Sequence, residues 1–229
     1  MLNFHTLLIV TTLLIKAIGL QRSYMNKWNT IPTPEQLTAT VAALKANGID
    51  AEVVENAAEA KARALELIPE GSEVMTMTSM TLEKIGLADE INQEGGKYSS
   101  LRMKLMSMDS KNDHEEMNKI GAAPEYTVGS VHAVTEDGKV VVVSNTGSQL
   151  PAYAYGSSHV VWVVGAQKIV KNLDEAMARV YEHVLPLESE RAHKAYGVEA
   201  SYVSKVLVFN REVNPTRLKM ILVKEQLGF

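Results

Sequence analysis

The sequence has no cysteine and no long apolar run. Without cysteine, the chain cannot form disulfides, thiol nucleophiles, cysteine-ligated zinc sites or iron–sulfur clusters of its own. Lys and Arg number 23 against 27 Asp and Glu, so we expect no basic surface for nucleic acid. No run reaches the roughly 18 apolar residues of a membrane-spanning helix. We therefore expect a cytoplasmic protein that does not span a membrane.

The sequence of 229 residues is 46% hydrophobic and 22% charged, which is typical of a globular protein. Helical and extended patterns alternate along it, and this predicts an α/β sheet with helices on its faces. Asp137-Gly138 predicts a two-residue β-hairpin, with Glu136 and Lys139 able to pair across its strands. Predicted helices span 34–46, 57–68, 81–85, 109–119 and 173–184; predicted strands span 49–54, 73–77, 126–135, 140–144, 159–164, 203–209 and 218–223.

Residues 1–24 differ from the rest. Their apolar run, 7–15, is too short to cross a bilayer, and its flanks do not suit a secretory signal. We expect Met25 to be the natural start and residues 1–24 to be an extension outside the fold, against a weak membrane anchor or a docking segment as alternatives. Residues 25–229 are then expected to form a single domain.

The first candidate site contains Thr78, Ser79 and Thr81, between a predicted strand and a predicted helix. Ligands in open α/β sheets bind beyond the carboxyl ends of the strands. The hydroxyls and the free N–H groups of the helix start could hold an anion. The alternative is simple capping of the helix by Ser79 or Thr81.

The second candidate loop follows the predicted strand 140–144 and is polar without being charged. Its amide, hydroxyl and backbone groups suit a carboxylate or phosphate, and an ordinary turn is the alternative. The candidate residues in it are Asn145, Thr146, Gly147, Ser148 and Gln149.

Three further residues carry charge. Lys168 follows a predicted buried strand and could neutralise a bound anion, or could extend from a helix start to water. Glu136 is a weaker candidate, as a catalytic nucleophile or base or as a surface partner of Lys139. Arg191 could bind a carboxylate through two hydrogen bonds or pair with Glu188.

The six histidines show no metal-ligand spacing, so we predict no metal site. The expected partner of the chain is a small anionic metabolite. The oligomeric state stays open, a homo-oligomer included.

The same segments resemble the LUD-domain family, the lactate-utilisation protein C group. The similarity covers nearly everything from Met25 onward, and it is carried by the segment 79–87, the hairpin 129–138, the segments 144–151, 155–159 and 165–170, the stretch 186–191 and the ending 221–229. The resemblance implies a fold like that of CoA transferases and sugar-phosphate isomerases, a largely parallel sheet flanked by helices. It also implies a role in L-lactate oxidation to pyruvate beside separate iron–sulfur subunits. It supplies no settled catalytic residue.

Three hypotheses follow. The first is a cytoplasmic component of L-lactate oxidation that binds a small carboxylate or related anion and holds no cofactor itself. The second is a stand-alone CoA-transferase-like or sugar-phosphate-isomerase-like enzyme that uses Glu136. The third is a non-catalytic assembly protein. Whether the chain is an enzyme is therefore open at this point.

Overall fold

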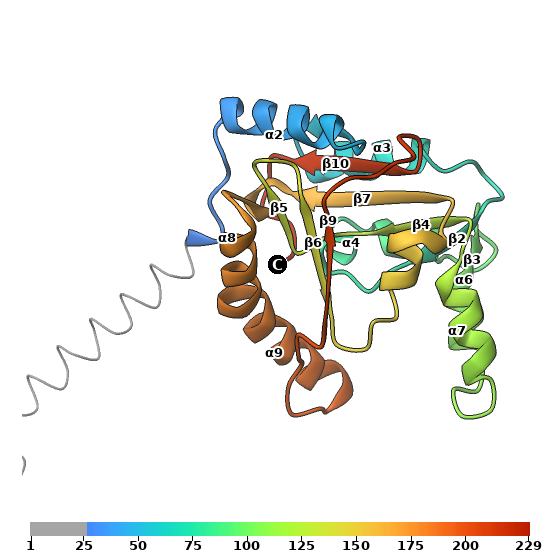
Figure 1. Cartoon of the computed structure of the whole chain (residues 1–229). Helices are drawn as coiled ribbons and strands as arrows, with labels where there is room; N and C mark the ends of the chain where they lie inside the picture. The colour runs from blue at the N-terminus through green and yellow to red at the C-terminus, as the bar shows by residue number, and fades with distance from the viewer. Residues whose placement is uncertain (1–26) are drawn as a thin grey trace, which may run out of the picture. The chain divides into compact units, whose positions relative to one another are not determined.

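The computed structural model describes residues 27–229. The prediction for residues 1–24 lies outside that range. Residues 31–229 form one compact unit and are described here (Figure 1).

The main sheet has six strands, all parallel, in the order β1-β10-β7-β4-β2-β3. It confirms the predicted α/β fold with a largely parallel sheet flanked by helices. Its strands are β1 (Asp50–Val54), β2 (Glu73–Thr76), β3 (Ser99–Ser100), β4 (Tyr126–Gly129), β7 (His159–Gly165) and β10 (Leu218–Val223).

A second sheet of four strands has the order β8-β5-β6-β9. The predicted hairpin is confirmed, because β5 and β6 pair antiparallel across Asp137-Gly138. The second sheet contains β5 (Ala133–Thr135), β6 (Val140–Ser144), β8 (Ile169–Val170) and β9 (Lys205–Phe209).

Several helices begin at a residue whose side chain caps them. The Thr33 side chain accepts from the N–H of Gln36, and the Gln36 side chain accepts from the N–H of Thr33, so the capping box is present. The helices are α2 (Pro34–Ala46), α3 (Ala57–Glu66), α4 (Met80–Lys84), α5 (Leu87–Ile91), α6 (Leu101–Met106), α7 (His114–Ala122), α8 (Leu173–Arg179) and α9 (Leu185–Tyr196), with π-helical turns η1 (Ala152–Gly156) and η3 (Val180–Val184) and a 3-10 turn η2 (Ala166–Lys168).

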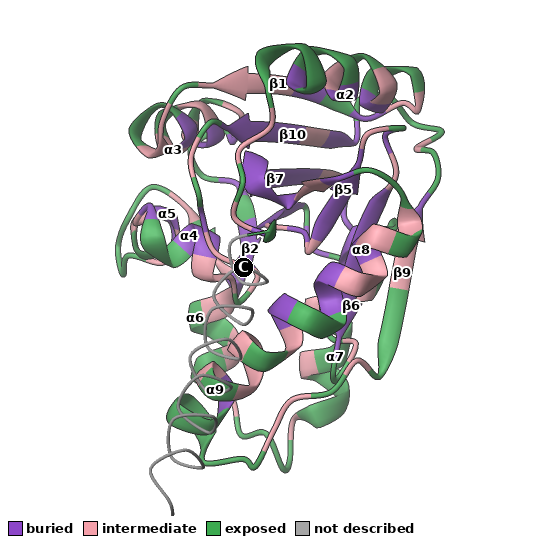
Figure 2. Ribbon diagram, turned by 90° about the vertical axis from the view of Figure 1, so that its left-hand side faces the viewer, coloured by how far each residue is buried: buried purple, intermediate pink, exposed green. Residues whose placement is uncertain are grey.

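The alternation of side chains along β7 supplies two hydrophobic cores. Val160, Trp162 and Val164 face the second sheet, whereas Val161 and Val163 pack with residues of α3, α4 and α5. The main sheet is therefore covered on both faces, and buried residues gather in its strands (Figure 2). Burial on both faces explains the continuous apolar sequence of β7.

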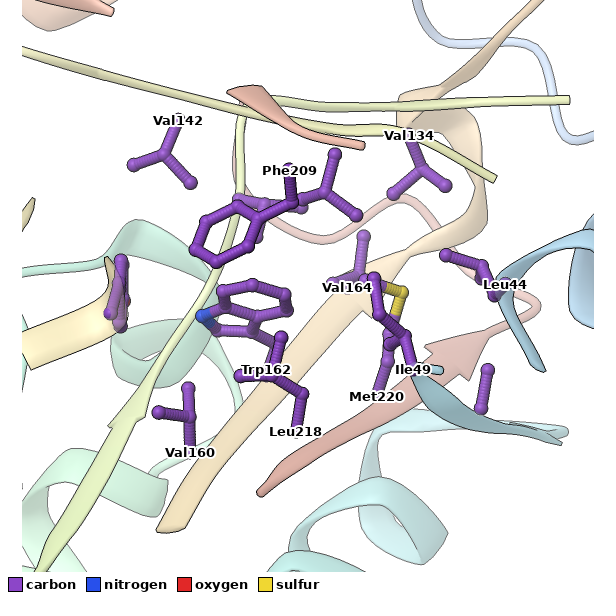
Figure 3. Close-up of a cluster of buried hydrophobic side chains, with 14 of the residues drawn as sticks. Leu44, Ile49, Val134, Val142, Val160, Trp162, Val164, Phe209, Leu218 and Met220 are labelled. Atoms are coloured by element: carbon purple, nitrogen blue, oxygen red, sulfur yellow. The ribbon is translucent and has the colours of Figure 1, made fainter. Parts of the chain in front are cut away.

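Aromatic rings join the two sheets. Trp162 of β7 meets Phe209 of β9 edge to face, with ring centroids 5.1 Å apart (Figure 3). On another side Trp162 meets Tyr153 of η1 at 5.4 Å. Such edge-to-face pairs contribute about 0.5–1.5 kcal/mol beyond the area they bury, so these rings help to fix the second sheet over the first.

The prediction of one strand over 126–135 is wrong. The chain leaves the main sheet after Gly129 and enters the second sheet at Ala133. A Cβ at Gly129 would lie 1.7 Å from the hydroxyl of Tyr153, so only glycine allows this approach. We call residues 130–132, which join the two sheets, the crossover.

Two smaller predictions are also wrong. The helix predicted from 109 begins only at His114, because the Asp109 carboxylate accepts from the N–H of Lys111 in a local turn. Lys139 pairs with Asp137 and not with Glu136. The charged side chains at the hairpin therefore interact within the turn instead of across the strands.

Candidate functional site

A cavity of about 490 Å³ lies where the carboxyl ends of β2 and β4 meet the second sheet. Its walls come from segments far apart in the sequence: the loop after β2, the crossover, the loop after β6, η2, and the run from η3 to residue 203. Parallel strands bring their carboxyl ends to one edge, which explains why these loops meet. The predicted candidate residues that line it are Thr78, Ser79, Thr81, Asn145, Thr146, Ser148, Gln149, Lys168 and Arg191.

Lys168 lies in the cavity wall and is only 2% exposed. Its Nζ donates to Thr81 Oγ1 at 3.2 Å, to Ser130 Oγ at 3.2 Å and to the carbonyl of Val131 at 3.1 Å. All three acceptors are neutral. Burial lowers the pKa of Lys168 well below its ordinary value, and the positive charge of Arg179 lowers it further. The structure therefore contains a buried amine without a carboxylate partner.

Lys168 forms a basic cluster with Arg179, His132 and His183. Arg179 is fully buried and donates from Nη1 to the carbonyl of His132 at 2.6 Å, while its Nε and Nη2 have no partner among the described residues. Burial lowers the pKa of Arg179 to about 10. This cluster concentrates positive potential behind the cavity.

Both histidines of the cluster are held neutral. Burial, and then the charges of Lys168 and Arg179, lower the pKa of His132 to about 3. The same causes lower the pKa of His183 to about 4, with Arg179 the larger charge effect. Nδ1 of His132 accepts from the N–H of Val143 at 3.1 Å, which assigns the proton of the neutral ring to Nε2.

The loop after β2 combines capping with cavity lining. Ser79 caps α4 by accepting from the N–H of Leu82 at 3.4 Å, so the capping alternative describes this residue. Thr81 accepts from Lys168 and donates to the carbonyl of Leu227 at 3.1 Å. Thr78 accepts from Arg102 of α6. The hydroxyls of Thr78 and Thr81 therefore contact basic side chains that line the cavity.

The loop after β6 is held by its own hydrogen bonds. Gln149 accepts from Ser144 Oγ at 2.9 Å and donates to the carbonyl of Val143 at 3.3 Å, which occupies both ends of its amide. Asn145 accepts from Ser204 at 3.1 Å. Gly147 has a positive φ of 91° and is not part of the cavity lining. Several polar side chains of this loop thus make hydrogen bonds that fix the conformation of the loop.

Arg191 and Glu136 lie in different surroundings. Arg191 makes two hydrogen bonds of 2.7 Å to Glu188, as the alternative for this residue states, and both side chains line the cavity. The bond to Glu188 raises the pKa of Arg191. Glu136 accepts from Gln36 at 3.2 Å at the hairpin and is not part of the lining. The structure does not bring Glu136 to the other candidates.

The sequence analysis missed Ser130, His132 and Arg102, which all line the cavity. Ser130 and His132 were hidden by the single strand predicted over 126–135, although two polar residues at alternate positions of an apolar run were a usable signal. Arg102 lies on a short helix without a pattern that distinguishes it from a surface arginine.

Cations outnumber carboxylates around the cavity. Among the side chains of its described lining residues, Arg102, Lys168 and Arg191 are basic, and Glu188 is the one acidic side chain. Hydroxyl groups supply further donors. Such a lining favours an anion held by charge and by hydroxyl hydrogen bonds.

Residues 27–229 contain no group of three His, Asp or Glu side chains able to hold a metal ion. None of the helices in that range is both long and apolar enough to cross a membrane.

Comparisons with known proteins identify a family and a similar fold. A family model described as the LUD domain matches residues 37–223. Among solved structures, a DUF162 family protein from Deinococcus radiodurans is similar in fold, with a TM-score of 0.51 and 13% sequence identity over 85% of this chain and 99% of that one. A search of curated proteins gave no significant match.

Proposed function

This chain belongs to the LUD-domain family, and from that premise we propose that its cavity binds a small carboxylate or related anion. We further propose that it serves as a cytoplasmic component of L-lactate oxidation to pyruvate, together with separate iron–sulfur subunits. The lactate role rests on the family resemblance described above. The anion site rests on the geometry of the cavity.

Lys168 carries the proposal. A buried ammonium without a carboxylate partner costs several kcal/mol unless a counter-ion or hydrogen bonds compensate for the lost water. Here the three acceptors around Nζ are neutral oxygens. A bound anion would supply the missing negative charge, and so the free protein is built to favour that ligand.

Ser130 links Lys168 to the cavity. Its Oγ accepts from Lys168 Nζ, and its hydroxyl hydrogen has no acceptor among the described residues. Because a hydroxyl that accepts from a cation is a stronger donor, Ser130 can donate to an anion in the cavity. Lys168 then acts from behind as the charge, and Ser130 makes the direct contact.

The division of labour follows from the chemistry of lactate oxidation, which releases two electrons. The chain has no cysteine to hold an iron–sulfur cluster. In the proposed assembly, the clusters that accept electrons therefore lie on other subunits, and this chain contributes the anion site.

The alternative enzymes, of the CoA-transferase or sugar-phosphate-isomerase type, relied on Glu136 as nucleophile or base. Glu136 lies outside the cavity lining and contacts Gln36. No specific observation favours that reaction here. The third hypothesis, a non-catalytic assembly protein, is the outcome expected if no anion binds.

Isothermal titration with L-lactate and with pyruvate tests the anion site. We expect Lys168→Met to weaken binding at least tenfold, because the compensating charge is lost, without lowering the melting temperature much. Titrations in buffers of different ionisation heat should show proton uptake, since a bound anion raises the pKa of Lys168. Affinity should accordingly fall as pH rises.

Lys45→Met is the matched control, because Lys45 is exposed on α2 and outside the cavity lining. It should leave affinity unchanged. Equal dissociation constants for Lys168→Met and the unmodified protein would remove Lys168 from the site. No binding of either anion would leave the assembly role as the surviving hypothesis.

A further inference from the structure

The cavity has two chemically different parts. One, which we call the polar pole, consists of Thr78, Arg102, Ser130, His132 and Lys168. It comes from the loop after β2, α6, the crossover and η2. The other, which we call the apolar wall, consists of Val180, Val184, Leu185, Tyr196, Val198 and Tyr202, from η3, α9 and the connection to β9. The paired side chains of Glu188 and Arg191 also line the cavity from α9.

The apolar wall exposes unusually large side chains. Tyr196 is 65% exposed, Tyr202 61% and Val198 43%. Single exposed apolar residues are ordinary, but large ones that gather on one rim mark contact sites. These three share the lining of one cavity, and so the rim itself is a candidate for ligand contact.

The size of the cavity agrees with a larger ligand. Its volume of about 490 Å³ lies within the 300–1,000 Å³ range typical of pockets for drug-sized molecules. A three-carbon acid such as lactate would fill only the polar pole. The apolar wall would then face water, with the guanidinium of Arg191 over the ring of Tyr196 and no ligand against Tyr202.

The wall is also shaped by an irregular helix. Val180 and Val184 belong to the π-helical turn η3, which directly follows Arg179 of the basic cluster. Single π-helical turns within helices are frequent at functional sites. The same turn thus connects the cations behind the polar pole to the apolar wall.

We propose that the ligand is an amphipathic carboxylate, with an aromatic or medium-chain aliphatic body. The carboxylate binds at the polar pole through Ser130 and the charge of Lys168. The apolar body lies against Tyr202 and Val198. This inference rests on the anion site proposed above and extends it, because it assigns a ligand larger than lactate.

A chain-length series in isothermal titration tests it on the full chain. The probes are L-lactate, 2-hydroxyhexanoate and 3-phenyllactate, with 3-phenylpropanol as the uncharged comparison. Burial of a methylene strengthens binding up to about fourfold. We expect 3-phenyllactate to bind at least tenfold more tightly than lactate, and the alcohol to bind more weakly than 3-phenyllactate.

Variants separate the two parts of the cavity. Tyr202→Ser should weaken 3-phenyllactate at least threefold and leave lactate unchanged. Tyr155→Ser is the matched control, because Tyr155 is 89% exposed and outside the lining; it should change neither ligand.

The outcomes are distinct. If lactate and 3-phenyllactate bind equally, or if Tyr202→Ser affects both alike, the amphipathic ligand is refuted and the anion site stands. If the alcohol binds as tightly as 3-phenyllactate, the role of the polar pole is refuted as well. If none of the acids binds, the anion site and this inference fail together.

Discussion

Two buried arginines at different ends of the molecule have opposite surroundings. Arg217 directly precedes β10 and is 7% exposed; its Nη2 lies 2.8 Å from Glu212 and 2.7 Å from the carbonyl of Tyr153. Arg179 ends α8, is fully buried, and makes one hydrogen bond, to the carbonyl of His132. The first has a carboxylate partner, and the second has none among the described residues.

The difference separates a structural cation from one that belongs to a site. The protein surrounds Arg217 with its own acceptors, and the bonds from Nη2 to the carbonyls of Tyr153 and Ala154 connect the start of β10 to η1. Arg179 and its neighbour Lys168 are left electrically incomplete beside a cavity. Charge that folding does not neutralise is charge available to a ligand.

The largest expected effect comes from breaking the Arg217 pair. Arg217→Met leaves the carboxylate of Glu212 without its cationic partner, with only the N–H of Asn214 donating to it, and should lower the free energy of unfolding by about 3–5 kcal/mol. Arg179→Met removes an unpaired charge and should be neutral or stabilising. Urea unfolding of both variants measures the contrast, and equal losses would contradict it.

Lowering the pH should destabilise the protein through His132 and His183 of the basic cluster. The unfolded state binds protons near the ordinary histidine pKa of 6.5, whereas His183 and His132 stay neutral in the fold down to about 4 and about 3. Because the pKa of each histidine is lower in the folded state than in the unfolded state, the folded state is fully favoured above pH 6.5. This stabilisation is lost as the pH falls below 6.5. From pH 7 to 5 each should cost about 2 kcal/mol.

Urea unfolding at a series of pH values checks this slope. His183→Gln should flatten it by roughly half, since one of the two depressed histidines is gone. His114→Gln, on the exposed face of α7, should leave the slope unchanged. A stability that stays level from pH 7 to 5 would show that the two rings are not held neutral.

The smallest effect concerns the contact between the basic cluster and the ligand. Ser130→Ala removes the proposed direct donor while Lys168 keeps its charge, so anion affinity should fall about tenfold, as expected for a hydrogen bond to a charged group. Ser158→Ala, at an exposed position outside the cavity lining, should not change affinity. If Ser130→Ala binds the anion as tightly as the unmodified protein, a group other than Ser130 donates to the anion.

The fold could be predicted from the sequence wherever the pattern is local. The apolar run of β7, the Asp137-Gly138 turn and the Thr33 cap each specify their element within a few residues, and the structure has them. The break at Gly129 could not be predicted in this way. It depends on the hydroxyl of Tyr153, which is distant in sequence and approaches only in the folded chain.

The candidate site was located by position and not by role. Loops after predicted strands supplied eight residues of the cavity lining, because the ends of strands can be predicted from the sequence; Arg191, on α9, is the ninth predicted residue there. The partners of those residues are not readable. The structure shows that Gln149 bonds within its own loop, that Arg191 pairs with Glu188 and that Glu136 lies outside the cavity lining. All three depend on contacts that are made only in the folded chain. Their binding roles stay predictions.

The crossover has a consequence for how the two sheets are joined. Nζ of Lys168 holds Ser130 and Val131 of the crossover, and Thr81 at the start of α4, in one network. The residues that join the two sheets thus also line the cavity. A ligand seated there would tighten the joint between the layers, and slower amide exchange in β5 would record it.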